Sequence, residues 1–208
     1  MLLELSLRPL IALLLLTSVG IGGCDRQSNG AQQANENLSA PAPAANGAAN
    51  ATAGGEGGAD STRTLDRSHK GEAAPDYAFE DPKGAKTSLA AFRGKPLLLN
   101  LWATWCAPCV KEMPTLDALA VQLGDTKQVL VLSQDIDDGR KRVGDYFAKT
   151  GFKKLQPYLD GDAAFSLNMG VNLPATILYD SQGKEVWRMT GSLDWTGAEA
   201  RALIAEAK

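Results

Sequence analysis

Histidine and cysteine are scarce in this 208-residue chain, which contains one histidine and three cysteines. The histidine, His69, lies in a polar stretch ahead of the main apolar segments, and we expect it to be a solvated residue. Histidine-dependent catalytic triads and histidine-rich metal sites are therefore excluded from the folded part. The net charge of -3 gives no electrostatic reason to expect nucleic acid as a partner.

A long membrane-spanning run is also missing. The uncharged run from Pro9 to Cys24 falls short of the roughly 20 apolar residues that a spanning helix needs. Arg8, the apolar core from Leu10 to Leu16 and the small residues before Cys24 predict an export signal over residues 1–24. Ile21-Gly22-Gly23 resembles a lipoprotein processing box, which would make Cys24 the lipid-bearing N-terminus. An uncleaved membrane anchor and an ordinary cleaved signal are the alternatives.

Residues 25–71 show almost no apolar periodicity and are rich in Ala, Asn, Gly, Gln, Ser and Pro. Such a segment cannot bury enough apolar surface to offset its chain entropy, so we expect a disordered linker. As a flexible coil, about 45 residues span roughly 35–40 Å. Residues 72–208 are then a single folded domain.

The folded part alternates strand and helix patterns, which predicts an α/β domain with a mixed central sheet covered by helices on both faces. An inserted segment is expected near 150–170, with a strand at 155–159 and a short helix capped by Asp162. A capping box at Thr196–Glu199 predicts the start of the final helix. The strands and helices expected elsewhere are a strand at 97–102, a helix at 110–123 kinked at Pro114, a strand at 129–132, a helix ending at Gly151, and a hairpin of 175–179 with 184–189.

The most informative motif is Cys106-Ala107-Pro108-Cys109, which lies between the buried strand and the following helix. At a helix N-terminus, backbone N–H groups and the helix dipole stabilise a Cys106 thiolate, and Cys109 lies one turn further on. We therefore expect Cys106 to be the nucleophile and Cys109 the resolving thiol, with no cofactor beyond this redox-active pair. Structural zinc would need four ligands, and a static disulfide would explain neither the helix start nor the flanking tryptophans.

The sequence around this motif resembles the TlpA/ResA-type membrane-tethered thiol-disulfide reductases of the bacterial cell envelope, and looks closest to TlpA. The resemblance rests on Trp105–Cys109, on the preceding Asn100–Thr104 and on the following Lys111–Pro114. It implies a thioredoxin-like fold over residues 72–208 with an N-terminal β-hairpin extension at 75–87.

The resemblance also implies further site residues. Pro174 would follow a cis peptide bond opposite the sulfurs and expose the backbone of Leu173 to an extended substrate, although the sequence alone favours an ordinary trans proline. Apart from the resemblance, we expect Trp102 to lie in the core and Trp105 at the rim of the site. Trp105 and Pro108 would offer substrates an apolar surface beside the thiols, and a packing role is the alternative for Trp105. Glu112 would accept the proton of Cys109, and a solvated helix glutamate is the equal alternative.

By the same resemblance, the protein would be periplasmic and tethered to the inner membrane. Its substrates would be protein disulfides, such as those of apocytochromes or copper-site proteins, and a membrane thiol transporter of the DsbD/CcdA type would supply electrons. The uncharged Ala107-Pro108 pair favours a reducing couple. The alternatives are a Cu(I)-binding metallochaperone, which would use the same thiols with Met113 or Met169, and a thiol oxidase or isomerase.

Overall fold

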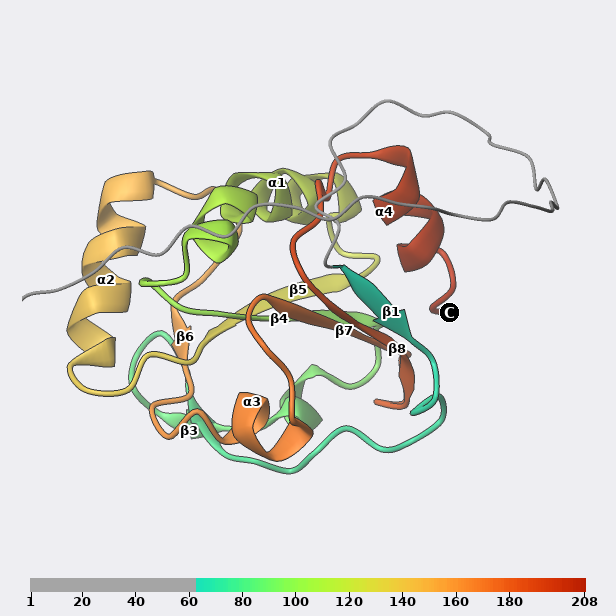
Figure 1. The fold of residues 1–208 in the computed structure, drawn as a ribbon, viewed down its shortest axis with the longest axis horizontal. Coiled ribbons are helices and arrows are strands. Elements are labelled where there is room, and N and C mark those ends of the chain that lie inside the picture. The colour runs from blue at the N-terminus through green and yellow to red at the C-terminus, as the bar shows by residue number, and fades with distance from the viewer. Residues whose placement is uncertain (1–62) are drawn as a thin grey trace, which may run out of the picture. The chain divides into compact units, whose positions relative to one another are not determined.

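The computed structural model describes residues 63–208 (Figure 1). The predicted export signal, the lipidation of Cys24 and most of the predicted linker therefore lie outside the described residues. Within residues 63–208, no helix is long and apolar enough to cross a membrane.

The core of the described part is one eight-stranded sheet with the order β1-β8-β7-β4-β5-β6-β2-β3. Strands β4, β5 and β6 are parallel, and every other neighbouring pair is antiparallel, so the predicted mixed sheet is confirmed. The strands are β1 Thr64–Asp66, β2 Phe79–Glu80, β3 Lys86–Thr87, β4 Leu97–Trp102, β5 Gln128–Ser133, β6 Tyr158–Leu159, β7 Ala175–Tyr179 and β8 Glu185–Thr190.

Helices cover both faces of this sheet, as predicted (Figure 1). The helices α1 Ala107–Leu123, α2 Gly139–Thr150 and α4 Ala198–Ile204 pack on one face, where their apolar residues join Leu98 and Trp102 of β4 in one core cluster. The helix α3 Ala164–Met169 and the 3-10 helix η1 Leu89–Phe92 join a second cluster on the other face. Since side chains alternate along a strand, the all-buried strand β4 contributes residues to both clusters. The cysteine turn follows β4 directly and therefore starts from the middle of the sheet.

The folded part begins earlier than predicted. Strand β1 pairs with β8, with Leu65 opposite Met189, so the linker boundary expected at residue 71 is wrong. His69 consequently belongs to the folded part, where its Nδ1 lies 3.0 Å from Glu72 Oε2 on the surface. Strand β1 is too short to show an apolar period in the sequence. Its order comes from backbone pairing with the edge of β8.

Several local details also differ from the sequence expectation. The predicted N-terminal hairpin is confirmed as β2 and β3, whereas the strand expected at 155–159 is reduced to β6. Asp160, not Asp162, accepts the backbone N–H of Phe165 near the start of α3, at 2.9 Å. The prediction of a capping box at the start of α4 is wrong, because the Thr196 hydroxyl donates to Asp194 and Gly197 is the N-cap.

Candidate active site

The cysteine pair lies at the junction of β4 and α1. A turn closed by a 3.1 Å hydrogen bond from Cys106 N to Ala103 O makes Cys106 the N-cap of α1. Cys106 and Cys109 form a disulfide, with their Cα atoms 5.2 Å apart. Cys106 is 6% exposed and Cys109 is fully buried. Of the two residues, only Cys106 presents any surface to a partner.

The start of α1 suits a thiolate at Cys106. Pro108 occupies the first turn, where no intrahelical N–H bond is needed, so it costs the helix nothing there. The backbone N–H of Cys109 donates to Cys106 Sγ at 3.3 Å. When the disulfide is reduced, this amide and the helix dipole stabilise negative charge on the outer sulfur.

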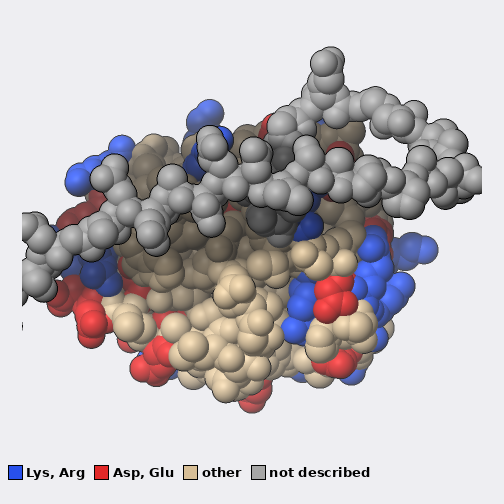
Figure 2. Space-filling model, viewed as in Figure 1, with Lys and Arg blue, Asp and Glu red and all other residues tan. Residues whose placement is uncertain are grey.

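The surface next to Cys106 is apolar and uncharged. Trp105 is 67% exposed, whereas Trp102 is fully buried, as the core and rim assignments of the two tryptophans predict. Pro108 is also exposed. Neither residues 96–110 nor residues 163–179 contain a charged side chain. Figure 2 shows the corresponding uncharged area over α3 and the loop that leads to β7, with Lys and Arg gathered beside β1 and β8.

The loop before β7 lies at the end of the sheet where the cysteine turn begins. The Leu173–Pro174 peptide bond is cis, as the family resemblance implies. Ala175, the first residue of β7, is opposite Leu101 near the end of β4, which places Pro174 level with the start of the cysteine turn. Pro174 O accepts a hydrogen bond from Gly191 N at 2.9 Å, and the backbone N–H and C=O of Leu173 make no hydrogen bond with residues 63–208. The backbone of Leu173 is thus available for pairing.

Glu112 is buried, so the alternative of a solvated helix glutamate is wrong. Its carboxyl accepts hydrogen bonds from Asn100 Nδ2 at 2.8 Å, Leu193 N at 3.1 Å and Trp195 Nε1 at 3.2 Å. Burial raises the pKa of Glu112 to about 7, against the three donors, which lower it. Because Glu112 follows Cys109 by three residues, both lie on one face of α1, where a carboxyl titrating near neutrality is suited to exchange a proton with the thiol.

Asp135 is a site residue that the sequence analysis missed. It is fully buried just after β5, and its carboxylate accepts hydrogen bonds from both the backbone N–H and the hydroxyl of Thr104, two residues before Cys106. The available signal was positional: the carboxyl ends of the parallel strands β4 and β5 meet at one edge of the sheet. An acidic residue directly after β5 therefore lies beside the cysteine turn.

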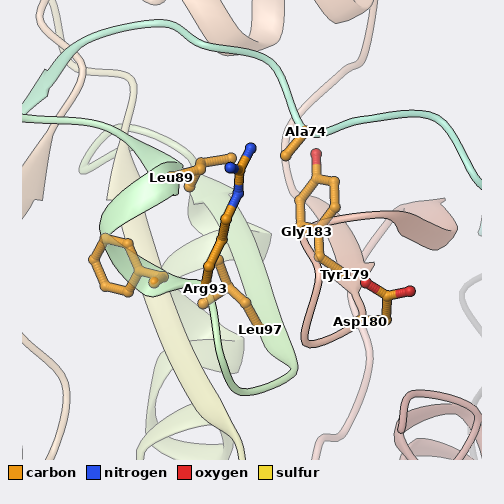
Figure 3. Close-up of a pocket in the computed structure, with 8 residues that line it drawn as sticks. Ala74, Leu89, Arg93, Leu97, Tyr179, Asp180 and Gly183 are labelled. Carbon is orange, nitrogen blue, oxygen red and sulfur yellow. The ribbon is translucent and has the colours of Figure 1, made fainter.

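Two hollows lie at the other end of β4. One holds about 10 Å³, room for one water molecule, and is bordered by Arg93, Leu97 and the buried hydroxyl of Tyr179, which has no partner among the described residues (Figure 3). The other, of about 290 Å³, is lined by Lys95, Lys127 and Lys154 among others. Since Leu97 is the first residue of β4 and the cysteines follow its last, neither hollow belongs to the redox site.

The methionines named for the copper alternative do not gather at the thiols. Met113 is fully buried in the cluster beneath α1, whereas Met169 packs against the cluster on the opposite face of the sheet. Within residues 63–208, no group of three or more His, Cys, Asp or Glu side chains is placed to hold a metal ion.

A mixed sheet, helices on both faces and a cysteine pair at the N-terminus of the first long helix define a thiol-disulfide redox protein of thioredoxin-like fold. The chain belongs to the redoxin family, whose profile matches residues 69–204.

Named relatives agree with this class. The chain is 34% identical over 122 residues to the thiol-disulfide oxidoreductase ResA of Bacillus thuringiensis subsp. konkukian, covering 58% of this chain and 69% of ResA. It is 32% identical over 147 residues to the thiol:disulfide interchange protein DsbE of Vibrio cholerae, covering 66% and 77%. The pneumococcal exposed lipoprotein thioredoxin Etrx1 of Streptococcus pneumoniae shares the fold, with a TM-score of 0.54, 24% identity and coverage of 62% of this chain and 98% of that one. The protein is a thiol-disulfide oxidoreductase of the ResA/DsbE type.

Proposed function

We propose that this oxidoreductase is a periplasmic protein-disulfide reductase, tethered to the inner membrane, that acts on cysteines of apocytochromes or copper-site proteins during cytochrome c or cytochrome oxidase assembly. The observation that carries the redox assignment is the Cys106–Cys109 disulfide at the start of α1, of which only Cys106 reaches the surface, with 6% of its area exposed. The similarity to ResA and DsbE and the export signal predicted for residues 1–24 support the cellular setting.

In the first proposed step, the Cys106 thiolate attacks one sulfur of a substrate disulfide. A bond forms between Cys106 Sγ and that sulfur, the substrate S–S bond breaks, and the second substrate sulfur leaves as a thiolate that takes a proton. The exposed Trp105 and the free backbone of Leu173 hold the substrate segment beside Cys106.

In the second step, Cys109 resolves the mixed disulfide. Cys109 gives its proton to the Glu112 carboxylate and attacks Cys106 Sγ, so that the enzyme disulfide forms and the first substrate sulfur leaves as a thiolate. The substrate gains two electrons, and the enzyme loses them. A membrane thiol transporter of the DsbD/CcdA type restores the dithiol by the reverse exchange.

Trapping tests the proposed roles of the two cysteines. A Cys109→Ala variant can form the mixed disulfide but cannot resolve it, so partner proteins should remain bound through Cys106 on non-reducing gels. Cys106→Ala is the matched control and should trap no partner, because Cys109 is buried. If the purified wild-type domain catalysed no thiol-disulfide exchange, the proposed reaction would be refuted. Trapped partners that lack haem-binding or copper-binding cysteines would instead overturn only the assembly role.

Membrane attachment has a separate test at Cys24. If Cys24 carries lipid, the Cys24→Ala variant should lose incorporation of labelled fatty acid and leave the membrane fraction. Retention of the Cys24→Ala variant in the membrane would favour the uncleaved N-terminal anchor. Release of the wild-type protein into the soluble fraction would favour the ordinary cleaved signal.

A further inference from the structure

The turn that delivers Cys106 is bound to a fully buried carboxylate. Asp135 Oδ2 accepts the backbone N–H of Thr104 at 2.8 Å, and Asp135 Oδ1 accepts its hydroxyl at 2.6 Å. Thr104 and Trp105 are the two central residues of the turn that the bond from Cys106 N to Ala103 O closes. Asp135, which follows the neighbouring strand β5, therefore fixes the turn through both the backbone N–H and the hydroxyl of Thr104.

Asp135 is itself held from two further elements. The Ser133 hydroxyl at the end of β5 donates to Asp135 Oδ2 at 2.7 Å, and Arg142 Nε of α2 lies 3.4 Å from Asp135 Oδ1. Arg142 also donates to Ile136 O at 2.6 Å. A buried carboxylate is costly without hydrogen-bonding and ionic partners. Because Asp135 has such partners in three parts of the chain, at Thr104, Ser133 and Arg142, its side chain is held in one position.

We propose that Asp135, acting through Thr104, is a positioning residue for the redox reaction: it holds Cys106 Sγ against the N-terminal amides of α1 and turns Trp105 outward beside it. This inference rests on the proposed exchange at Cys106 and adds to it the group that orients the nucleophile. Asp135 itself touches neither substrate nor sulfur in this role.

The physical reason is the dependence of thiolate stability on the position of the sulfur. The amide of Cys109 lies 3.3 Å from Cys106 Sγ, and the favourable field of a helix N-terminus fades within its first turn. A turn that loses one of its two bonds to Asp135 samples positions in which the sulfur is further from these amides. The thiolate is then less stabilised, and reacting groups meet in the required geometry less often.

Thr104→Val tests the proposal most cleanly, because it removes the hydroxyl but keeps the backbone N–H, the side-chain volume and the charge of Asp135. Thr104→Ser restores the hydroxyl. Thr126→Val is the matched control, because Thr126 Oγ1 makes a 2.7 Å bond to Leu123 O at the far end of α1. For each reduced protein, the pH profile of Cys106 alkylation by iodoacetamide gives the thiol pKa, and steady-state reduction of a peptide disulfide gives kcat and KM.

Thr104→Val should raise the pKa of the Cys106 thiol and lower kcat for exchange about 10-fold to 100-fold, the scale associated with a misplacement of about 1 Å. Thr104→Ser and Thr126→Val should stay close to wild type, and circular dichroism should show the same fold for all four proteins. The proposal is overturned if folded Thr104→Val has the thiol pKa and the kcat of Thr126→Val. If wild type itself exchanges no disulfide, the proposed function fails, while the alkylation profile still decides whether Asp135 positions Cys106.

Discussion

Replacing Glu112 by glutamine should remove a pH dependence from the stability of the oxidised domain. Burial raises the pKa of Glu112 from 4.5 to about 7, although hydrogen bonds from Leu193, Asn100 and Trp195 oppose the shift. The folded protein therefore keeps a proton on this carboxyl over a pH range in which the unfolded chain has lost it. The resulting stabilisation is fully present below the unfolded pKa of 4.5 and is lost as the pH rises through about 7.

The size of the effect follows from the two pKa values. A rise from 4.5 to about 7 is 2.5 units, and at about 1.36 kcal/mol per unit the full stabilisation is about 3 kcal/mol. About 2.5 kcal/mol of it should disappear between about pH 5 and about pH 8. Glutamine does not titrate, so the unfolding free energy of wild type minus that of Glu112→Gln should fall by this amount over the range.

Urea unfolding, followed by the fluorescence of the buried tryptophans, measures this difference. The Cys106–Cys109 disulfide stays oxidised throughout, so that no thiol titrates. Replacement of the exposed Asp162 by asparagine is the control for the loss of a surface carboxyl. A difference between wild type and Glu112→Gln that does not vary with pH would refute the reasoning, because Glu112 would then titrate alike in the folded and unfolded states.

Three further results are expected. Trp195→Phe removes one donor to the Glu112 carboxylate, so the pKa of Glu112 should rise further, as carboxyl carbon NMR would show; an unchanged or lowered value would contradict the hydrogen bond. The couple of Cys106 with Cys109 should have a reduction potential below about -180 mV in glutathione equilibration, and a higher value would favour the oxidase or isomerase. Burial raises the pKa of Asp117, but three backbone N–H groups of residues 153–155 donate to its carboxylate, and the net pKa is lowered. Asp117→Asn should therefore lower the urea-unfolding free energy by about 1–3 kcal/mol at neutral pH, and the loss should shrink as acid protonates the wild-type carboxylate; a pH-independent loss would contradict this.

The parts that sequence predicted well are governed by local patterns. The all-buried β4, the Cys-x-x-Cys at the following helix start and the β7–β8 hairpin each follow from residues close together in the chain. The cis bond at Pro174 came from family resemblance, because a proline in a loop does not by itself indicate its isomer.

The parts that sequence did not predict depend on distant partners. Burial of Glu112 needs Leu193 and Trp195, which reach α1 from the loop after β8. The role of Asp135 needs two parallel strands to end side by side, and β1 needs the free edge of β8. No periodicity in a polar segment encodes such contacts, because they arise only after the sheet has formed.

The two outer strands of the sheet have a consequence for a protein that, by the function proposed above, binds segments of other proteins. β1 has three residues and stands beside Arg63 and Arg67, and β3 has two, one of them Lys86. Short edge strands with positively charged side chains are poor templates for a strand of another chain, which would otherwise pair with the sheet and start aggregation. Under the proposed function, a substrate chain would instead pair with the open backbone at Leu173, at the end of the sheet that carries Cys106, so that binding and disulfide exchange would occur in one place.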